Sequence, residues 1–319
     1  MKKLLCAAFA VLFLLSACGC GKTVSKKARV SITATTFPVY DLVREIIGNA
    51  DGVSLTLLLK SGADPHNFQP TAADMVTIAS SDIFIYIGGE SDAWAEDTLK
   101  IVAGENVAAV NLTDRLGSLV KKEEHSEGMQ EEHSSEEHKE EENDEHIWLS
   151  LKNAAAMCDV ICDELCRADP NLAEHYRTQN ESFKKRLSEL DGEYENAVKS
   201  AARDTLIFAD RFPFLYLLSD YSLNFYAAFP GCSAESEASF KTVTFLAQKA
   251  DELGISHILI IDGSNGKIAE TVIENTKRKN AKILRLDSMQ SVSLKDSENG
   301  VTYLSVMQKN LSVLKEALS

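Results

Sequence analysis

The feature that most constrains the fold is the stretch 171–201, which carries a helical pattern and almost no strand signal. Its apolar residues recur at the spacing expected on one face of an α-helix: Tyr176, Phe183, Leu187, Leu190, Tyr194 and Val198. One helix over this range would be roughly 45 Å long at 1.5 Å per residue. We therefore predict a single rigid helix over 169–201 that divides the chain into two parts.

On both sides of this helix, short apolar or β-branched segments alternate with helical ones. Strands are predicted at 29–35, 53–59, 83–87, 107–112, 205–208, 224–229, 257–261 and 283–286. A segment such as IFIYI (83–87) is apolar throughout, which is typical of parallel strands buried on both faces. We expect an α/β fold of two lobes, 29–168 and 202–319, each with a central sheet flanked by helices.

The N-terminus has the pattern of an export signal. Two lysines precede an apolar run (4–15) that is shorter than the 18 or more residues a membrane span needs. The run ends in Leu-Ser-Ala-Cys at Cys18, an order that resembles a bacterial lipobox. We expect 1–17 to be a lipoprotein signal peptide and 18–28 a tether with its lipid on Cys18. The lipid would hold the protein on the extracytoplasmic face of a cell membrane.

Residues 121–146 are dominated by carboxylates and imidazoles. They contain twelve Asp and Glu against three Lys, a net of −9 out of the chain's −15. They also contain four of the seven histidines: His125, His133, His138 and His146. Such a segment cannot bury enough apolar surface to fold, so 121–145 is predicted to be a disordered loop. Its composition indicates metal binding, and the acidic balance of the chain argues against a nucleic-acid partner.

Two histidines stand where a loop meets ordered structure. His66 lies between two prolines just after the predicted strand 53–59, and His146 ends the acidic segment directly before an apolar stretch. Ligands bind beyond the carboxyl ends of strands in sheets of this kind, so we expect a cleft site between the lobes. Neutral imidazole binds zinc, which predicts metal affinity that falls below about pH 6.5.

These segments also resemble a known family. The motifs are GADPHNFQPTAADM (62–75), IYIGGESDAW (85–94), DEHIWLS (144–150), LDSMQSVS (286–293) and GVTYLSVMQKNLSVLKEAL (300–318). In this order, and over nearly all the mature chain, they are similar to the zinc/manganese solute-binding lipoproteins of ABC transporters. The resemblance implies a divalent cation buried between two lobes and its delivery to a membrane permease. His66 matches the first family ligand and His146 the second.

The chain departs from this family at the third ligand position. Arg211 stands there, and an arginine side chain cannot coordinate a metal. Glu237 matches an acidic position that the family keeps, and it either ligates the metal or pairs with Arg211. Asp210, Asp262 or a histidine of the acidic loop are the other groups that remain open. We predict Glu237 as the third ligand, since zinc accepts three protein ligands and a water.

The predicted function is capture of a divalent metal by a lipid-anchored monomer that serves an ABC permease, with no catalytic residues. Nitrogen-rich ligation favours zinc (Zn²⁺), with manganese (Mn²⁺) as the second choice. The acidic loop would collect zinc and pass it to His66 and His146. Three alternatives remain: a manganese-specific protein of the same type, a surface metal buffer or adhesin without a permease, and a metal-dependent hydrolase.

Overall fold

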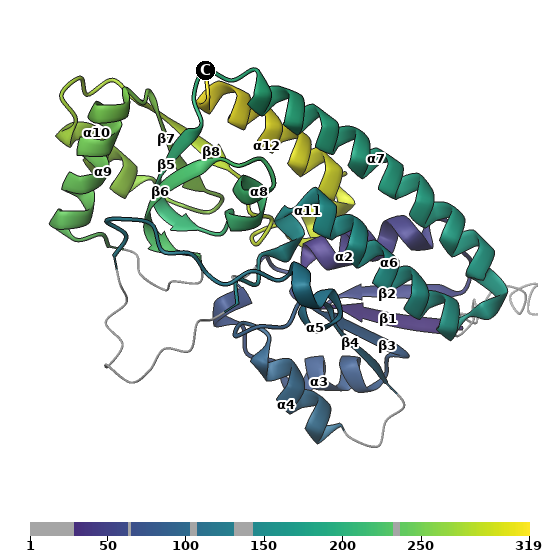
Figure 1. The fold of residues 1–319 in the computed structure, drawn as a ribbon. Helices are drawn as coiled ribbons and strands as arrows, with labels where there is room; N and C mark the ends of the chain where they lie inside the picture. The colour runs from purple at the N-terminus through teal and green to yellow at the C-terminus, as the bar shows by residue number, and fades with distance from the viewer. Residues whose placement is uncertain (1–28, 63–64, 103–106, 131–142, 232–236) are drawn as a thin grey trace, which may run out of the picture.

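The computed structural model of the chain describes residues 29–62, 65–102, 107–130, 143–231 and 237–319. They form two α/β lobes that lie next to each other, with one long helix running along both (Figure 1). The expected two-lobed α/β fold is therefore confirmed. The predicted signal peptide and tether, with Cys18, lie outside the described residues.

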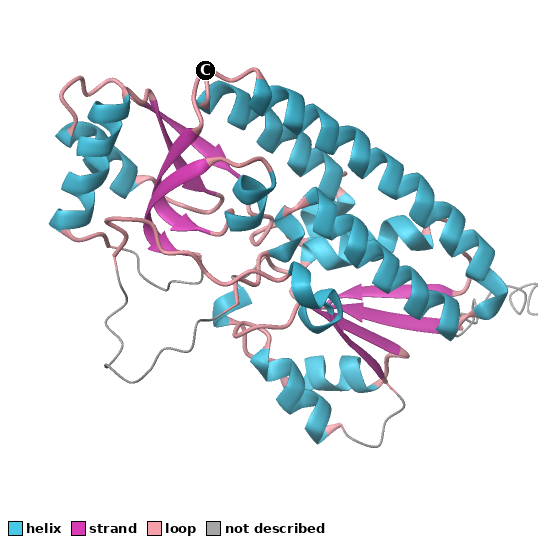
Figure 2. Ribbon diagram, viewed as in Figure 1, coloured by secondary structure: helices cyan, strands magenta, loops and turns pink. Residues whose placement is uncertain are grey.

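The N-terminal lobe is built on a parallel sheet whose two faces are both covered. The strand order is β2 (Val53–Leu57), β1 (Val30–Ala34), β3 (Ile83–Tyr86) and β4 (Ala108–Asn111). Ile83 and Ile85 face α2 (Phe37–Ile47) and α6 (Leu151–Ala168), whereas Phe84 and Tyr86 face α3 (Ala72–Ala79) and α4 (Ala93–Ile101). The layers are visible in Figure 2. This alternation explains why β3 is apolar throughout.

The C-terminal lobe repeats the arrangement. Its parallel strands lie in the order β6 (Asn224–Pro230), β5 (Thr205–Phe212), β7 (His257–Ile261) and β8 (Lys282–Leu286). Ile258 and Ile260 face α9 (Phe240–Leu253) and α10 (Lys267–Asn275). Leu259 and Ile261 face the inner side with α12 (Tyr303–Ala317). The remaining short elements are α5 (Leu112–Leu116), α8 (Leu215–Asp220), α11 (Leu294–Glu298) and the 3-10 turns Pro65–Asn67, Gly117–Leu119, Ile147–Leu149 and Pro170–Leu172.

The predicted long helix is present as α7 (Ala173–Lys199). Its buried face packs against α2 and α6 of the first lobe and α12 of the second. This face carries Tyr176, Asn180, Phe183, Leu187, Leu190 and Tyr194. The Tyr194 hydroxyl also donates to the Met307 carbonyl oxygen at 2.6 Å. One hydrophobic cluster runs through the inner faces of both sheets and these helices. The lobes therefore share a core.

Shortening one α7 side chain should destabilise the whole molecule. Leu187 is 1% exposed in the shared core, so Leu187→Ala is expected to lower the free energy of unfolding by about 2–5 kcal/mol. Lys185→Ala, on the exposed face of the same helix, should change it by less than about 0.5 kcal/mol. Urea denaturation followed by circular dichroism measures both. Equal effects of the two substitutions would contradict the shared core.

The prediction that all of 121–145 is disordered is wrong for the part that the structure describes. Lys122 pairs with Asn143 in an antiparallel bridge, and Asp144 and Glu145 are buried at 2% and 4% exposure. The composition misled because these carboxylates find imidazole partners inside the protein, and the backbone on either side finds hydrogen bonds. Residues 131–142, with His133 and His138, lie outside the described residues.

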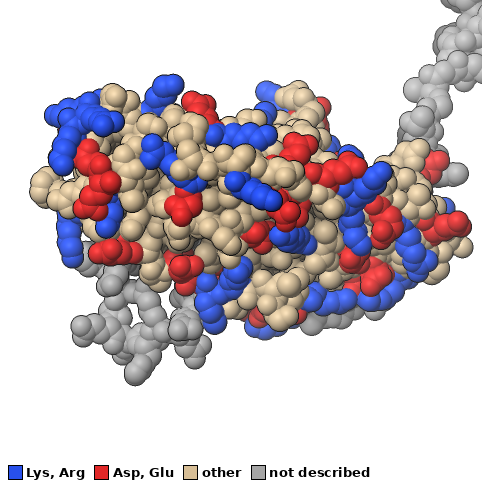
Figure 3. Space-filling view, turned by 45° about the horizontal axis from the view of Figure 1, so that its top comes forward, with Lys and Arg blue, Asp and Glu red and all other residues tan. Residues whose placement is uncertain are grey.

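The charges on the body of the molecule are mixed in sign. On the face seen in Figure 3, blue Lys and Arg side chains alternate with red Asp and Glu. Pairs such as Lys184 with Asp159 and Arg186 with Glu45 link α7 to its neighbours. Within the described ranges, no helix combines the length and the apolar character needed to cross a bilayer.

Candidate metal centre

Three polar side chains from distant parts of the chain meet at one point. His66 lies in the 3-10 turn after β2, His146 precedes the turn Ile147–Leu149, and Gln290 lies in the turn after β8. Nε2 of Gln290 is 2.9 Å from Nε2 of His66 and 3.1 Å from Nε2 of His146. The two imidazole centroids are 5.7 Å apart. The structure therefore brings the two predicted histidines together, with Nε2 of each facing a common point.

Carboxylates behind the imidazoles determine which ring nitrogens carry protons. Glu145 Oε1 lies 3.2 Å from His66 Nδ1, which also contacts the Ser91 hydroxyl, and Asp144 Oδ1 lies 3.0 Å from His146 Nδ1. With Nδ1–H donating on that side, each Nε2 keeps a lone pair, and the two N–H groups of the Gln290 amide donate to these lone pairs. Metal-binding histidines usually have the second ring nitrogen held by a carboxylate in this way.

Burial strengthens the interactions between these groups. His146 is fully buried, and burial by itself lowers its pKa, but the Asp144 carboxylate, with Glu145 and Glu123, raises the pKa above its ordinary value. For Glu145, burial raises the pKa, but the hydrogen bond from His66 and the charge of His146 bring it below its ordinary value. Both results describe carboxylates that favour positive charge at His146. The same carboxylates would also attract a divalent cation bound between the two Nε2 atoms.

A small cavity adjoins the His66 imidazole. Its volume is about 10 Å³, and its walls include Thr36, His66, Asp92, Glu145 and Gln290. Thr36 Oγ1 is buried and has no hydrogen-bond partner among the described residues. A space of this size holds about one water molecule. The described residues hold no cluster of three or more His, Cys, Asp and Glu side chains that could bind a metal, so an ion at the two imidazoles would need the Gln290 amide or this water to complete its ligands.

Asp262 holds the turn that carries Gln290. Its Oδ1 accepts hydrogen bonds from the backbone N–H and the hydroxyl of Ser288, both at 2.6 Å. Its Oδ2 accepts from the backbone N–H of Ser291 at 3.2 Å and contacts the Ser291 hydroxyl. Gly62 allows the loop after β2 to pack on this turn, because a Cβ there would lie 2.2 Å from the Ser291 carbonyl oxygen. Asp262 thus positions Gln290, and its oxygens are already used by the turn.

The structure does not bring Glu237 to the two histidines. Glu237 is exposed, two residues before the N-cap Ser239 of α9. Across the described ranges it makes no hydrogen bond or ion pair with His66, His146 or Gln290. Arg211 lies at a bulge in β5, where its backbone N–H donates to Asp210 at 2.9 Å. Residues 232–236 lie outside the described residues.

Our reading of the sequence missed Gln290 and the roles of Asp144 and Glu145. Gln290 follows the carboxyl end of β8 as His66 follows that of β2, so the same rule about strand ends could have selected it. Asp144 and Glu145 directly precede His146, and the acidic character of the whole loop hid their separate role. A carboxylate that contacts Nδ1 of a histidine has no fixed spacing from it in the sequence. Glu145, for example, contacts Nδ1 of His66, although it is adjacent to His146 in the sequence.

Comparisons with known proteins identify the family of the chain. Residues 32–317 match the family described as "Zinc-uptake complex component A periplasmic" (ZnuA). The chain is 28% identical to the "High-affinity zinc uptake system protein ZnuA" of Bacillus subtilis, covering 97% of this chain and 95% of that protein. It is also 28% identical to the "Zinc-binding protein AdcA" of Streptococcus pyogenes serotype M18, covering 92% of this chain but spanning only 57% of that longer protein.

Solved structures show the same fold. The laminin binding protein Lmb of Streptococcus agalactiae has a TM-score of 0.75 with 23% identity, covering 91% of this chain and all of that one. The match to the family extends over nearly the whole folded region, including His66, His146 and Gln290. The chain therefore belongs to the ZnuA family of zinc-uptake complex components.

Proposed function

We propose that this protein captures zinc between its two lobes and delivers it to an ABC permease in the membrane. The observation that carries the proposal is the pair of Nε2 atoms that face one point, each on a ring whose Nδ1 is held by a carboxylate. The pattern supports a metal ligand pair more than two structural histidines, because it leaves both lone pairs directed at the same position. Membership of a zinc-uptake family supports zinc as the cargo.

The protein ligands that we propose are His66, His146 and Gln290. Gln290 enters because its amide is already within 3.1 Å of both imidazoles and its oxygen is an acceptable ligand atom. Glu237 remains a prediction, and it would have to move from its exposed position to take part. Two imidazoles and a neutral amide favour zinc over manganese, which prefers oxygen-rich, carboxylate-containing sites.

We further propose that the protein works outside the cytoplasm on a lipid anchor at Cys18, as a monomeric binding protein rather than an enzyme. The lipobox-like sequence supports the anchor. His125, His133 and His138 would form weak sites that raise the local zinc concentration before transfer to His66 and His146. A relative in Streptococcus pneumoniae is named "Zinc-binding lipoprotein AdcA". That name supports a lipid anchor outside the cytoplasm for this protein as well.

Growth under zinc limitation tests the whole proposal. A strain without this protein should stop growing when a chelator removes free zinc, and added zinc, but not manganese, should restore growth. The wild-type gene should also restore growth, whereas a gene with His66→Ala and His146→Ala should not. Full rescue by that double variant would refute delivery through this centre. Rescue of the missing gene by manganese alone would favour the manganese alternative.

The carboxylate behind His146 gives a more specific prediction. Asp144→Asn keeps the size of the side chain but removes the charge at 3.0 Å from Nδ1. Loss of such a partner is expected to lower zinc affinity about 10- to 100-fold, because Nε2 of the imidazole becomes a less basic ligand for the metal. Competition with a chelator at pH 7.5 measures the affinity. Asp159→Asn, which removes a half-exposed charge on α6, should leave it within about twofold.

A further inference from the structure

The first part of the acidic segment lies on the C-terminal lobe. We call residues 121–130 the arm. The backbone N–H of Gln130 donates to the Ala228 carbonyl oxygen at 2.9 Å. The side-chain oxygen of Gln130 accepts a hydrogen bond from the backbone N–H of Ser239 at 2.7 Å. Ser126 Oγ accepts from the backbone N–H of Ala227 at 3.3 Å. The arm thus runs along β6, which is the edge strand of its sheet.

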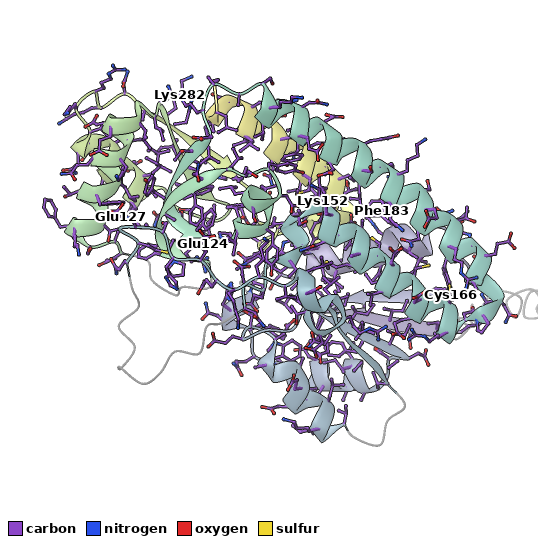
Figure 4. All side chains as sticks on the ribbon, viewed as in Figure 1. Glu124, Glu127, Lys152, Cys166, Phe183 and Lys282 are labelled. Carbon is purple, nitrogen blue, oxygen red and sulfur yellow. The ribbon has the colours of Figure 1, made fainter. Side chains whose placement is uncertain are left out.

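The packing of the arm is also close. Gly128, with φ at 79°, sits against Phe245 of α9, where a Cβ would lie 2.1 Å from the ring. Glu124 and Glu127 of the arm lie beside β6 in Figure 4, and both line one cavity with Asn224 and Tyr226 of that strand. The arm leaves the first lobe and docks on the second, so it connects the lobes on the side away from α7 (Figure 1).

A single hydroxyl joins the two ends of the acidic segment where it leaves the fold. Tyr216, a fully buried residue of α8, accepts the backbone N–H of Lys121 at 2.9 Å and donates to the Asp144 carbonyl oxygen at 2.6 Å. The backbone N–H of Asp144 donates to the Lys121 carbonyl oxygen at 2.9 Å. This neck, formed by residues 121–122 and 143–144, is therefore pinned to the C-terminal lobe by Tyr216.

The neck leads directly to the metal centre. The Asp144 side chain accepts from the backbone N–H of His146 at 2.8 Å and lies 3.0 Å from His146 Nδ1. Gly231 also packs closely against the ring, since a Cβ there would lie 3.1 Å from His146 Cε1 and 3.3 Å from Nδ1. The Gly231 backbone N–H donates to Glu123 of the arm at 3.1 Å. The neck therefore reaches His146 through Asp144, and the arm reaches it through Gly231.

We propose that Tyr216 is a positioning residue for metal binding, which transmits the docking of the arm on the C-terminal lobe through Asp144 to the His146 ring. The inference rests on the proposed metal site at His66 and His146. A group from the second lobe thus controls the geometry of a ligand from the first. Because coupling between two equilibria is reciprocal, metal binding must also tighten the arm on β6.

Tyr216→Phe removes only the hydroxyl and tests this inference. Zinc affinity should fall about tenfold, the lower end of the range seen when partners of metal ligands are lost. Zinc should slow amide hydrogen exchange in residues 121–130 of the wild-type protein, and it should do so much less in the variant. Tyr194→Phe is the matched control, because Tyr194 is equally buried and also donates to a backbone carbonyl. It should lose stability but keep its zinc affinity.

A double-mutant cycle separates positioning from a general loss of stability. If Tyr216 acts through Asp144, adding Tyr216→Phe to Asp144→Asn should lower zinc affinity little further, whereas independent effects would add. Gln130→Ala loosens the arm without touching the neck and should also weaken zinc binding, which keeps the test available if Tyr216→Phe folds poorly. Additive effects, or Tyr216→Phe binding zinc as tightly as Tyr194→Phe, would overturn the inference. Absence of zinc binding by the wild-type protein would instead refute the proposed function.

Discussion

Tight zinc binding is expected to disappear when His66 and His146 are both replaced by alanine. The two imidazoles supply both nitrogen ligands of the proposed centre. Structural zinc sites with four protein ligands bind with about 10–16 kcal/mol, so two ligands account for several kcal/mol. At about 1.4 kcal/mol per tenfold, the dissociation constant should rise by about 10³-fold or more. Isothermal titration calorimetry of metal-free protein, with a chelator as competitor, measures this change.

The control for this experiment is another histidine. His125 in the arm has a half-exposed side chain and lies near Glu123 at 3.9 Å. His125→Ala should remove at most a weak zinc site and leave the dissociation constant of the tight site within about twofold. Substitutions of exposed residues away from a site usually have small effects. If the double variant binds zinc as tightly as the wild-type protein, the centre lies elsewhere. If His125→Ala abolishes tight binding, the arm supplies a ligand directly.

Replacement of Gln290 by glutamate is expected to strengthen zinc binding. The change places a negative charge where a neutral amide now lies within 3.1 Å of both imidazoles. Two unit charges 4 Å apart attract each other by about 4 kcal/mol at an effective dielectric constant of 20. Part of this is spent on desolvating the new carboxylate, so we expect an increase on the order of 10- to 100-fold at pH 7.5. Chelator competition measures it.

The same substitution should change the dependence on pH. In the metal-free protein, the Gln290 amide donates to both Nε2 lone pairs, and a carboxylate cannot do so. Protons should therefore compete with zinc more strongly in Gln290→Glu, and the gain in zinc affinity should shrink as the pH falls towards 6. Gln308→Glu adds the same charge on the exposed side of α12 and should change neither quantity. Identical behaviour of the two variants would remove Gln290 from the centre.

Much of the fold could be predicted because its signals are local. The apolar positions of α7 repeat every three or four residues, which is the period of an α-helix. The predicted strands agree with the eight that the described residues form. The short helices α5 and α11 were not predicted, because five residues are too few to show a periodic pattern.

The candidate centre could be predicted only in part. His66 and His146 stood out because a histidine next to prolines, or at the end of an acidic run, is visible in the sequence. Glu237 was selected from a family position, and the structure places it on the surface instead. Gln290 was passed over because the residue type glutamine does not stand out as a metal ligand, although its position beyond the end of β8 could have selected it. Only the meeting of the β2 and β8 ends shows that its amide lies between the imidazoles.

The sequence by itself determined two α/β lobes, the helix that joins them and the two histidines. These follow from apolar periodicity and from residue type, which are properties of short segments. The tertiary structure alone decided that Gln290 separates the imidazoles, that Glu145 and Asp144 hold their Nδ1 atoms, and that Tyr216 pins the neck of the acidic segment. Apart from the local contact between Asp144 and His146, each of these depends on where strand ends and loops from different parts of the chain meet. Hydrogen bonds across such distances leave no regular spacing in the sequence.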